Sequence, residues 1–164
     1  MPTAQRTRTI HASPKELWEV LGDPHHLPRW WPRVSRVEAV EHDAFTEVLT
    51  SAKGKIVRAD FHLVDSVSER RIVWSQQIEN TPFARVLKSA ETEVSLAGAQ
   101  VSLSGAGDGS SSYGAGDGPV TEVTIELRQS LQGFLARLGG HLVRRAAGST
   151  IEEALDGLER IVGH

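Results

Sequence analysis

The sequence has no cysteine among its 164 residues. Without a thiol, the chain can form no disulfide, no cysteine nucleophile and no cysteine-ligated zinc or iron–sulfur site. An excess of positive charge is also missing, because 18 Lys and Arg stand against 21 Asp and Glu and give a net charge of −3. Neutralising the phosphates of a nucleic acid requires such an excess, so we expect no nucleic-acid partner.

Long apolar runs are absent as well. No stretch approaches the ~20 apolar residues of a membrane span, and the first residues, MPTAQRTRTIHASP, lack the apolar segment of a signal peptide. We therefore expect a cytoplasmic protein without stable membrane insertion. The length favours a single domain over residues 1–164, and a domain of this size has a core large enough to be stable without a metal; we expect neither metal nor cofactor.

Helix signals come early in the chain. Ser13 can cap a helix that has Pro14 at its first position and Glu16 to close a capping box, and this pattern predicts a helix ending near Leu21. Asp23 can cap a second short helix that ends at the tryptophan pair 30–31.

Strand signals follow. From Val34 to Gln77 the apolar period shifts towards two, most clearly over 56–64, which is typical of antiparallel strands. Further strands are predicted over 90–96 and 123–127.

The region that follows contains a compositionally distinct stretch and a helical tail. Residues 104–119, SGAGDGSSSYGAGDGP, are predicted to form a flexible insertion in a hairpin. Its two GAGDG copies lack the glycine spacing of a dinucleotide fingerprint and are too few for a calcium-binding β-helix. Residues 130–162 show the longest helical pattern in the sequence. Gly148 lies in its middle, so the pattern allows either a continuous helix or a helix kinked near this residue.

Histidines and carboxylates form no metal or catalytic motif. His25 and His26 are adjacent, whereas ligands on a helix need a spacing of three or four residues to share a face. Arg58, Asp60 and His62 share one strand face opposite the apolar side, which favours a solvated outer surface. No G-x-S-x-G or H-E-x-x-H motif is present.

The few aromatic residues are concentrated where a cavity would lie. Ordinary core packing would account for any one of these aromatic residues. The residues expected to point inward, such as Ala59, Ala90 and Thr92, are small, so they leave space and favour a cavity between a curved sheet and the terminal helix. The predicted ligand-binding lining consists of Trp30, Trp31, Val57, Ala59, Phe61, Ile72, Trp74, Val94, Ile125, Phe134, Leu138 and Leu142.

The order of the predicted elements resembles the helix-grip fold of the START/birch-pollen-allergen (SRPBCC) superfamily, and within it the bacterial polyketide cyclase/dehydrase and lipid-transport group. The matching segments are SPKELWEVL at 13–21, LPRWWPRV at 27–34, and AAG with IEEALDGL at 146–158. The resemblance implies an α+β fold in which a seven-stranded curved antiparallel sheet wraps around a long C-terminal helix, with a ligand cavity between them.

Three functions remain open at this stage. The leading hypothesis is binding or transport of a hydrophobic or aromatic small molecule, lipid- or polyketide-like. The alternative enzyme, a polyketide cyclase or dehydratase, needs a polar group facing the hollow, for which Gln76, Tyr113, Arg128 and His141 are candidates. The third is a protein-interaction module that docks through its tail helix, and the chain is expected to be a monomer or a homodimer.

Overall fold

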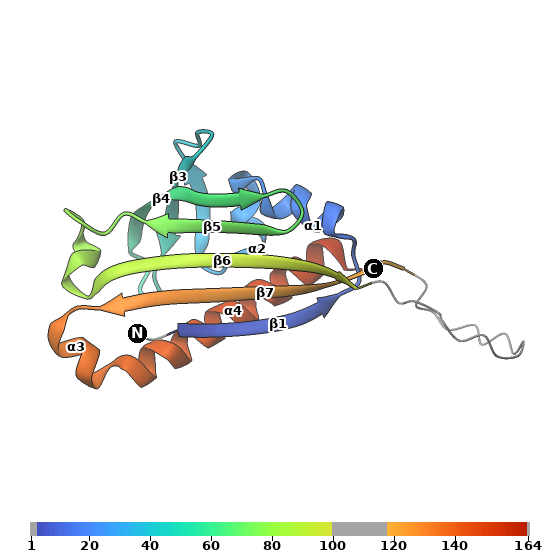
Figure 1. The fold of residues 1–164 in the computed structure, drawn as a ribbon. Coiled ribbons are helices and arrows are strands. Elements are labelled where there is room, and N and C mark those ends of the chain that lie inside the picture. Colours follow the sequence, from blue (N-terminus) through green and yellow to red (C-terminus); the bar gives the residue numbers. More distant parts are fainter. Residues whose placement is uncertain (1–2, 100–117, 164) are drawn as a thin grey trace, which may run out of the picture.

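A computed structural model describes residues 3–99 and 118–163 (Figure 1). Most of the insertion predicted at 104–119, with Tyr113, lies outside these residues. The strands are β1 Thr3–Ile10, β2 Val34–Glu38, β3 Ala44–Thr50, β4 Ile56–Val67, β5 Arg71–Gln76, β6 Leu87–Ala99 and β7 Val120–Leu131. The helices are α1 Pro14–Leu21, α2 Leu27–Trp30, α3 Gly133–Leu138 and α4 Gly140–Val162, with short 3₁₀ turns at Pro24–His26 and Pro82–Arg85.

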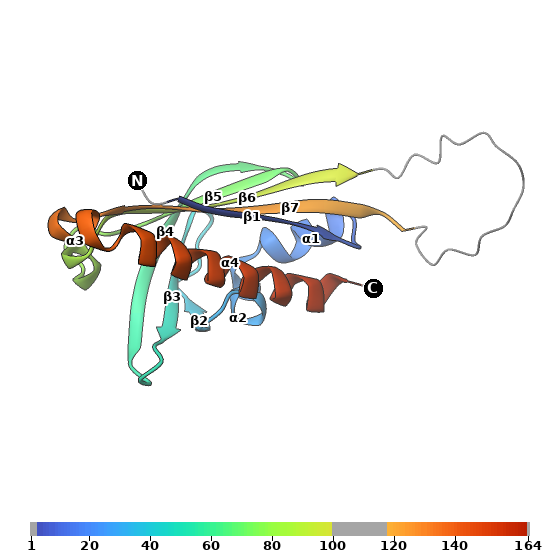
Figure 2. The same cartoon turned by 90° about the horizontal axis from the view of Figure 1, so that it is seen from below.

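The strands form one antiparallel sheet in the order β1-β7-β6-β5-β4-β3-β2. Strand β1 lies at one edge and pairs with β7, so the first and last strands of the chain are neighbours in the sheet. Figure 2 shows α4 crossing one face of the sheet, with β3 and β4 bending towards the same side as the helix. The α+β helix-grip architecture expected from the resemblance is thereby confirmed.

The two short helices after β1 begin where the sequence predicts. The Ser13 hydroxyl accepts a hydrogen bond from the Glu16 backbone N–H at 3.1 Å, and Pro14 occupies the first turn of α1. The Asp23 carboxylate accepts from the His25 backbone N–H at 3.0 Å and caps the 3₁₀ turn that leads into α2. These caps fix where α1 and the 3₁₀ turn before α2 start, whereas α2 itself has no side-chain cap. Helix α1 contacts β6, and α2 contacts α4 and β2.

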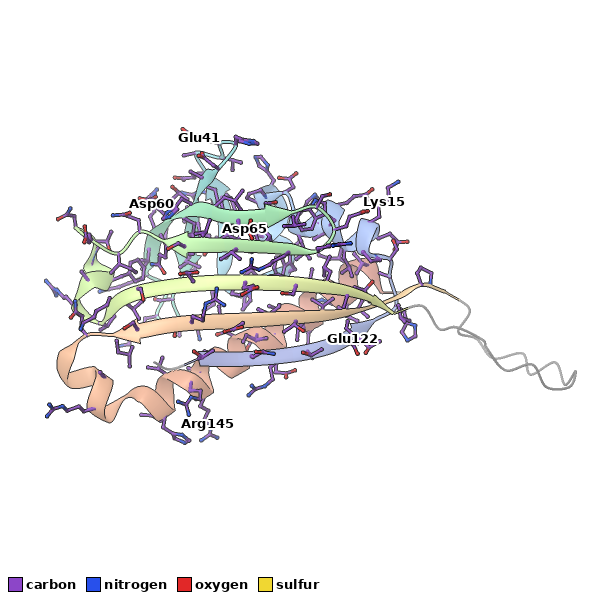
Figure 3. All side chains as sticks on the ribbon, in the orientation of Figure 1. Lys15, Glu41, Asp60, Asp65, Glu122 and Arg145 are labelled. Carbon is purple, nitrogen blue, oxygen red and sulfur yellow. The ribbon has the colours of Figure 1, made fainter. Side chains whose placement is uncertain are left out.

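Alternation along the strands separates an inner face from an outer face. In β4, Ala59 is buried, whereas Arg58, Asp60 and His62 are exposed, as predicted for a solvated outer face. Asp60 and Glu122 are among the charged side chains that Figure 3 shows over the sheet. The inner face packs against α1, α2 and α4 and forms the core.

The C-terminal third differs from the helical pattern predicted over 130–162, for which a kink near Gly148 was the alternative to a continuous helix. Strand β7 continues to Leu131, which pairs with Leu87 of β6, and Gly139 then separates α3 from α4. Helix α4 continues through Gly148 without interruption, so the break lies nine residues earlier than the possible kink. A Cβ at 148 would lie 2.6 Å from a guanidinium nitrogen of Arg6, but this nitrogen ends a flexible, exposed side chain that can move aside, so packing does not require glycine at this position.

The second half of α4 is held tightly. A Cβ on Gly157 would lie 2.5 Å from the backbone oxygen of Trp30, so only glycine lets α4 approach α2 this closely. From β1, the Arg8 guanidinium donates to Asp156 at 2.5 Å and to Glu152 at 2.8 Å. These contacts anchor the C-terminal half of α4 on the sheet. The first half of the helix borders the cavity between the helix and the sheet.

Candidate functional site

A cavity lies between the inner face of the sheet and the first half of α4. Its main chamber encloses about 290 Å³ and is bordered by β3 to β7 and by Val143, Ala146, Ala147 and Thr150 of α4. A smaller compartment of about 30 Å³ adjoins it deeper in the aromatic part of the sheet. An outer groove of about 460 Å³, between the β3–β4 hairpin and α4, shares Trp31 and Leu49 with the main chamber.

Aromatic rings build the wall of the deep compartment. Phe45 and Phe61 are cross-strand partners on β3 and β4 and stack with ring centroids 5.4 Å apart and an interplanar angle of 8°. Trp74 of β5 meets Phe45 edge to face at 6.1 Å, and Trp31 follows α2 and borders all three spaces. Planar apolar walls of this kind favour a flat, apolar guest.

A carboxyl group interrupts this apolar wall. Glu47 lies on the inner face of β3 opposite Ala59 and borders both the deep compartment and the main chamber. Glu47 is only 6% exposed, and among the described residues no group forms a hydrogen bond or an ion pair with its side chain. Burial raises the pKa of the Glu47 carboxyl to about 8, because the charged form is less well solvated there than in water. The group is therefore neutral at pH 7.

An amide with an unused donor faces the same chamber. Gln76, at the end of β5, pairs in register with Phe61, and its side-chain Nε2 is buried without a hydrogen-bond partner among the described atoms. Thr92 of β6 and Gln129 of β7 add further polar groups to the lining. The chamber thus combines an apolar aromatic floor with a few polar side chains that have capacity to bind.

The predicted lining residues fall into three groups. Those bordering the described spaces are Trp31, Val57, Phe61 and Trp74. Those buried on the inner side of the sheet or beneath α4 are Trp30, Ala59, Ile72, Val94 and Ile125. The side chains of Phe134 and Leu138 lie outside the described part of the chain, and Leu142 is 67% exposed on α4, so it faces solvent instead of the cavity.

Sequence reasoning missed Glu47, the most unusual group in the cavity. The signal was its position two residues from both Phe45 and Leu49, which places it on their face of a strand. Thr92 and Ala90, identified only as small inward residues, do line the chamber.

A family model described as "Polyketide cyclase / dehydrase and lipid transport" matches residues 1–163. The chain belongs to this family. A comparison with curated proteins finds no match.

Solved structures similar to this polyketide cyclase/dehydrase and lipid-transport family member support the fold. A START superfamily protein from Mycobacterium smegmatis is 16% identical with a TM-score of 0.68, over 98% of this chain and 96% of that one. A conserved protein from Geobacillus kaustophilus is 15% identical with a TM-score of 0.69, over 96% and 93%. The di-domain ARO/CYC StfQ from the steffimycin biosynthetic pathway is 12% identical with a TM-score of 0.66, and the match covers 98% of this chain but 50% of that one.

The other candidate polar groups of this family member lie elsewhere. Arg128 forms ion pairs with Glu91, Glu93 and Glu126 at 2.6 to 3.3 Å. His141 is exposed at the start of α4. Across residues 3–99 and 118–163, no group of His, Asp and Glu side chains is arranged to hold a metal ion. In the same residues, no helix is long and apolar enough to cross a membrane.

Proposed function

We propose that the protein binds a hydrophobic or aromatic small molecule in the chamber between the sheet and α4. The observation that carries this proposal is the chamber of about 290 Å³ that the packed core leaves open beside the aromatic residues Phe61 and Trp31. Small-molecule sites are typically concave and mostly apolar, with a few placed polar groups, and this chamber has that composition.

The apolar walls supply enough free energy for a small ligand to bind. A flat molecule of two fused rings that buries about 250 Å² of apolar surface gains about 6 kcal/mol at about 25 cal/mol per Å². Loss of ligand freedom reduces this gain, so we expect micromolar to millimolar affinity from burial alone. The START superfamily relative and the ARO/CYC relative share the fold, and membership in a cyclase and lipid-transport family supports an organic ligand.

A blocking substitution tests the proposal without removing core side chains. Ala146 is exposed on the first half of α4 and borders both the main chamber and the outer groove, so Ala146→Phe fills the space where the ligand would lie. Arg145→Phe is the matched control, because Arg145 is exposed and borders none of the described spaces (Figure 3).

The readout is calorimetric titration with 2-acetylnaphthalene, supported by native mass spectrometry of protein purified from its source. We expect saturable binding to the natural sequence and to Arg145→Phe, and binding weakened tenfold or more in Ala146→Phe. Absence of binding by this probe and by lipid probes, together with ligand-free protein in the mass spectrum, contradicts the proposal. Unchanged binding to Ala146→Phe places the ligand elsewhere.

Catalysis is a second candidate, because Gln76 lies in the chamber together with Glu47. A neutral Glu47 carboxyl can protonate the β-hydroxyl of a hydroxy ketone, so that the C–O bond breaks and water leaves. The resulting carboxylate can then take the proton from the α-carbon as the C=C bond forms, which regenerates the acid. The test is incubation with a naphthyl β-hydroxy ketone and detection of the conjugated enone by its absorbance. Formation of the enone that is lost in Glu47→Gln supports this candidate, and a rate equal to that in buffer excludes it for this substrate.

A further inference from the structure

The Glu47 carboxyl is the one strongly polar group of the aromatic compartment. It shares that compartment with Trp31, Phe45, Phe61 and Trp74, and it reaches the main chamber as well. A buried acid with no partner destabilises a fold, so its presence at an inward strand position calls for a role that the free protein does not display.

The charges around Glu47 restrict what can satisfy it. Among the described residues that line the deep compartment and the main chamber there is no Lys, Arg or His. Glu91 borders the main chamber, but its carboxylate is ion-paired with Arg128 at 3.2 Å. Arg33 and Glu153 border only the outer groove. No element packed against Glu47 therefore supplies a positive charge that would ionise it.

The second unsatisfied group in the chamber is a hydrogen-bond donor. Gln76 Nε2 is buried and has no hydrogen-bond partner among the described atoms. Gln76 lies on β5, and β4, which carries Phe61, separates this strand from Glu47 on β3. A carboxyl in its neutral form is likewise a donor through its O–H. Glu47 and Gln76 thus both border the main chamber, where Trp31 and Phe61 supply aromatic surface, and neither side chain has a hydrogen-bond partner among the described residues.

We propose that the Glu47 and Gln76 side chains, which border the same chamber, donate hydrogen bonds to oxygen acceptors on an uncharged aromatic ligand, so that the cavity selects ketones and related carbonyl compounds and rejects carboxylates. This inference rests on the proposed function and assigns the chemical class of the ligand. Glu47 donates its O–H to a carbonyl oxygen while the ring system of the ligand packs against the phenylalanine and tryptophan side chains. Gln76 donates its amide N–H either to the same carbonyl oxygen of the ligand or to a second oxygen of the ligand.

Charged ligands fit the cavity less well than neutral ones. A carboxylate ligand would meet Glu47 with no cation to compensate it, and it would lose its hydration on burial. An ammonium ligand offers only donors, so it would leave the Gln76 N–H without an acceptor even if aromatic faces attracted the cation. A neutral carbonyl compound satisfies both groups and loses little hydration.

Four probes with one ring system separate these alternatives. They are 2-acetylnaphthalene, 2-ethylnaphthalene, 2-naphthoate and 1-(2-naphthyl)ethylammonium, each titrated calorimetrically between pH 5 and pH 9.5. At pH 7 we expect the ketone to bind about fivefold more tightly than the hydrocarbon, because this is the difference in affinity that one net hydrogen bond typically produces. We expect the carboxylate to bind ~100-fold more weakly than the ketone. Ketone affinity should be constant at acidic pH and fall above pH 8 towards that of the hydrocarbon.

Variants assign the effect to the carboxyl group. Glu47→Gln keeps a donor of similar size that does not titrate, so ketone binding should persist and lose its pH dependence. Glu47→Leu removes the donor, and the ketone should then bind no better than the hydrocarbon. Glu41→Gln, an exposed glutamate before β3, is the matched control and should behave as the natural sequence (Figure 3).

The outcomes separate this inference from the proposed function. Equal binding of ketone and hydrocarbon at every pH overturns the selection of carbonyl compounds and leaves ligand binding intact. Tightest binding of the ammonium probe, rising with pH up to about 8, overturns it in favour of a cationic ligand. Binding of none of the four probes counts against the proposed function itself.

Discussion

Replacing Glu47 by glutamine should stabilise the protein, and by an amount that depends on pH. The two side chains have nearly the same size, so the packing against Phe45 and Phe61 is kept. The substitution removes only the ionisable proton. Any difference in the pH dependence of unfolding between the two proteins therefore reports on the Glu47 carboxyl alone.

The magnitude follows from the pKa of Glu47 in the folded and unfolded chain. The pKa is about 8 in the folded protein, against an ordinary value of 4.5. Between these values the folded state holds a proton that the unfolded state has released, so the free energy of unfolding falls as pH rises. At about 1.4 kcal/mol per pH unit, ionisation of Glu47 lowers the free energy of unfolding by about 3 kcal/mol between pH 4.5 and pH 7, and by about 4 kcal/mol between pH 4.5 and pH 8.

Urea unfolding at pH 5, 6, 7, 8 and 9 measures this difference. The free energy of unfolding of Glu47→Gln minus that of the natural sequence should increase with pH up to about pH 8 and then become constant. Glu41→Gln should give a difference that does not change with pH. A flat difference for Glu47→Gln would refute the reasoning, because it would mean that Glu47 is ionised and solvated in the folded protein.

Three further substitutions test the packing around the cavity. Gly157→Ala places a Cβ about 2.5 Å from the backbone oxygen of Trp30 and should cost about 2–4 kcal/mol, measured by urea unfolding; a cost below about 0.5 kcal/mol contradicts the close contact of α4 with α2. Thr121→Val removes the buried hydroxyl that donates to the backbone oxygen of Ala12 at 2.7 Å and should lower the free energy of unfolding by about 1–2 kcal/mol, while an unchanged midpoint would show that this oxygen needs no partner. Arg8→Met should cost about 1 kcal/mol at low salt and less in 0.5 M NaCl, since its carboxylate partners on α4 are half exposed; a cost independent of salt would assign the effect to packing.

The sequence predicts most of the fold because its strongest signals are local. The Ser13 cap and Pro14 fix the start of α1 within four residues of chain, and the alternation over 56–64 assigns the two faces of β4. Both depend on neighbouring residues only, so no knowledge of tertiary contacts is needed to read them.

The end of β7 and the chemistry of the cavity depend on contacts that are distant in sequence. Leu131 fits a helical stripe equally well, and its assignment to β7 comes from pairing with Leu87 of the neighbouring strand. Glu47 is hard to place because Val48, on the opposite face of β3, is also buried, so the strand has no single apolar side. The sequence shows that Glu47 shares a strand face with Phe45 and Leu49, but the packed sheet is needed to show that this face is the inner one and that the carboxyl lacks a partner among the described residues.

Helix α4 divides two requirements between its halves. Its later turns, with Gly157 against α2 and the Arg8 ion pairs, hold the domain together, whereas Val143, Ala146 and Thr150 on its earlier turns border the chamber. Substitutions on those earlier turns can therefore reshape the guest's space while leaving the anchoring contacts in place. A lineage carrying this scaffold can change what it accommodates by altering a few small side chains, without having to re-evolve a stable fold each time.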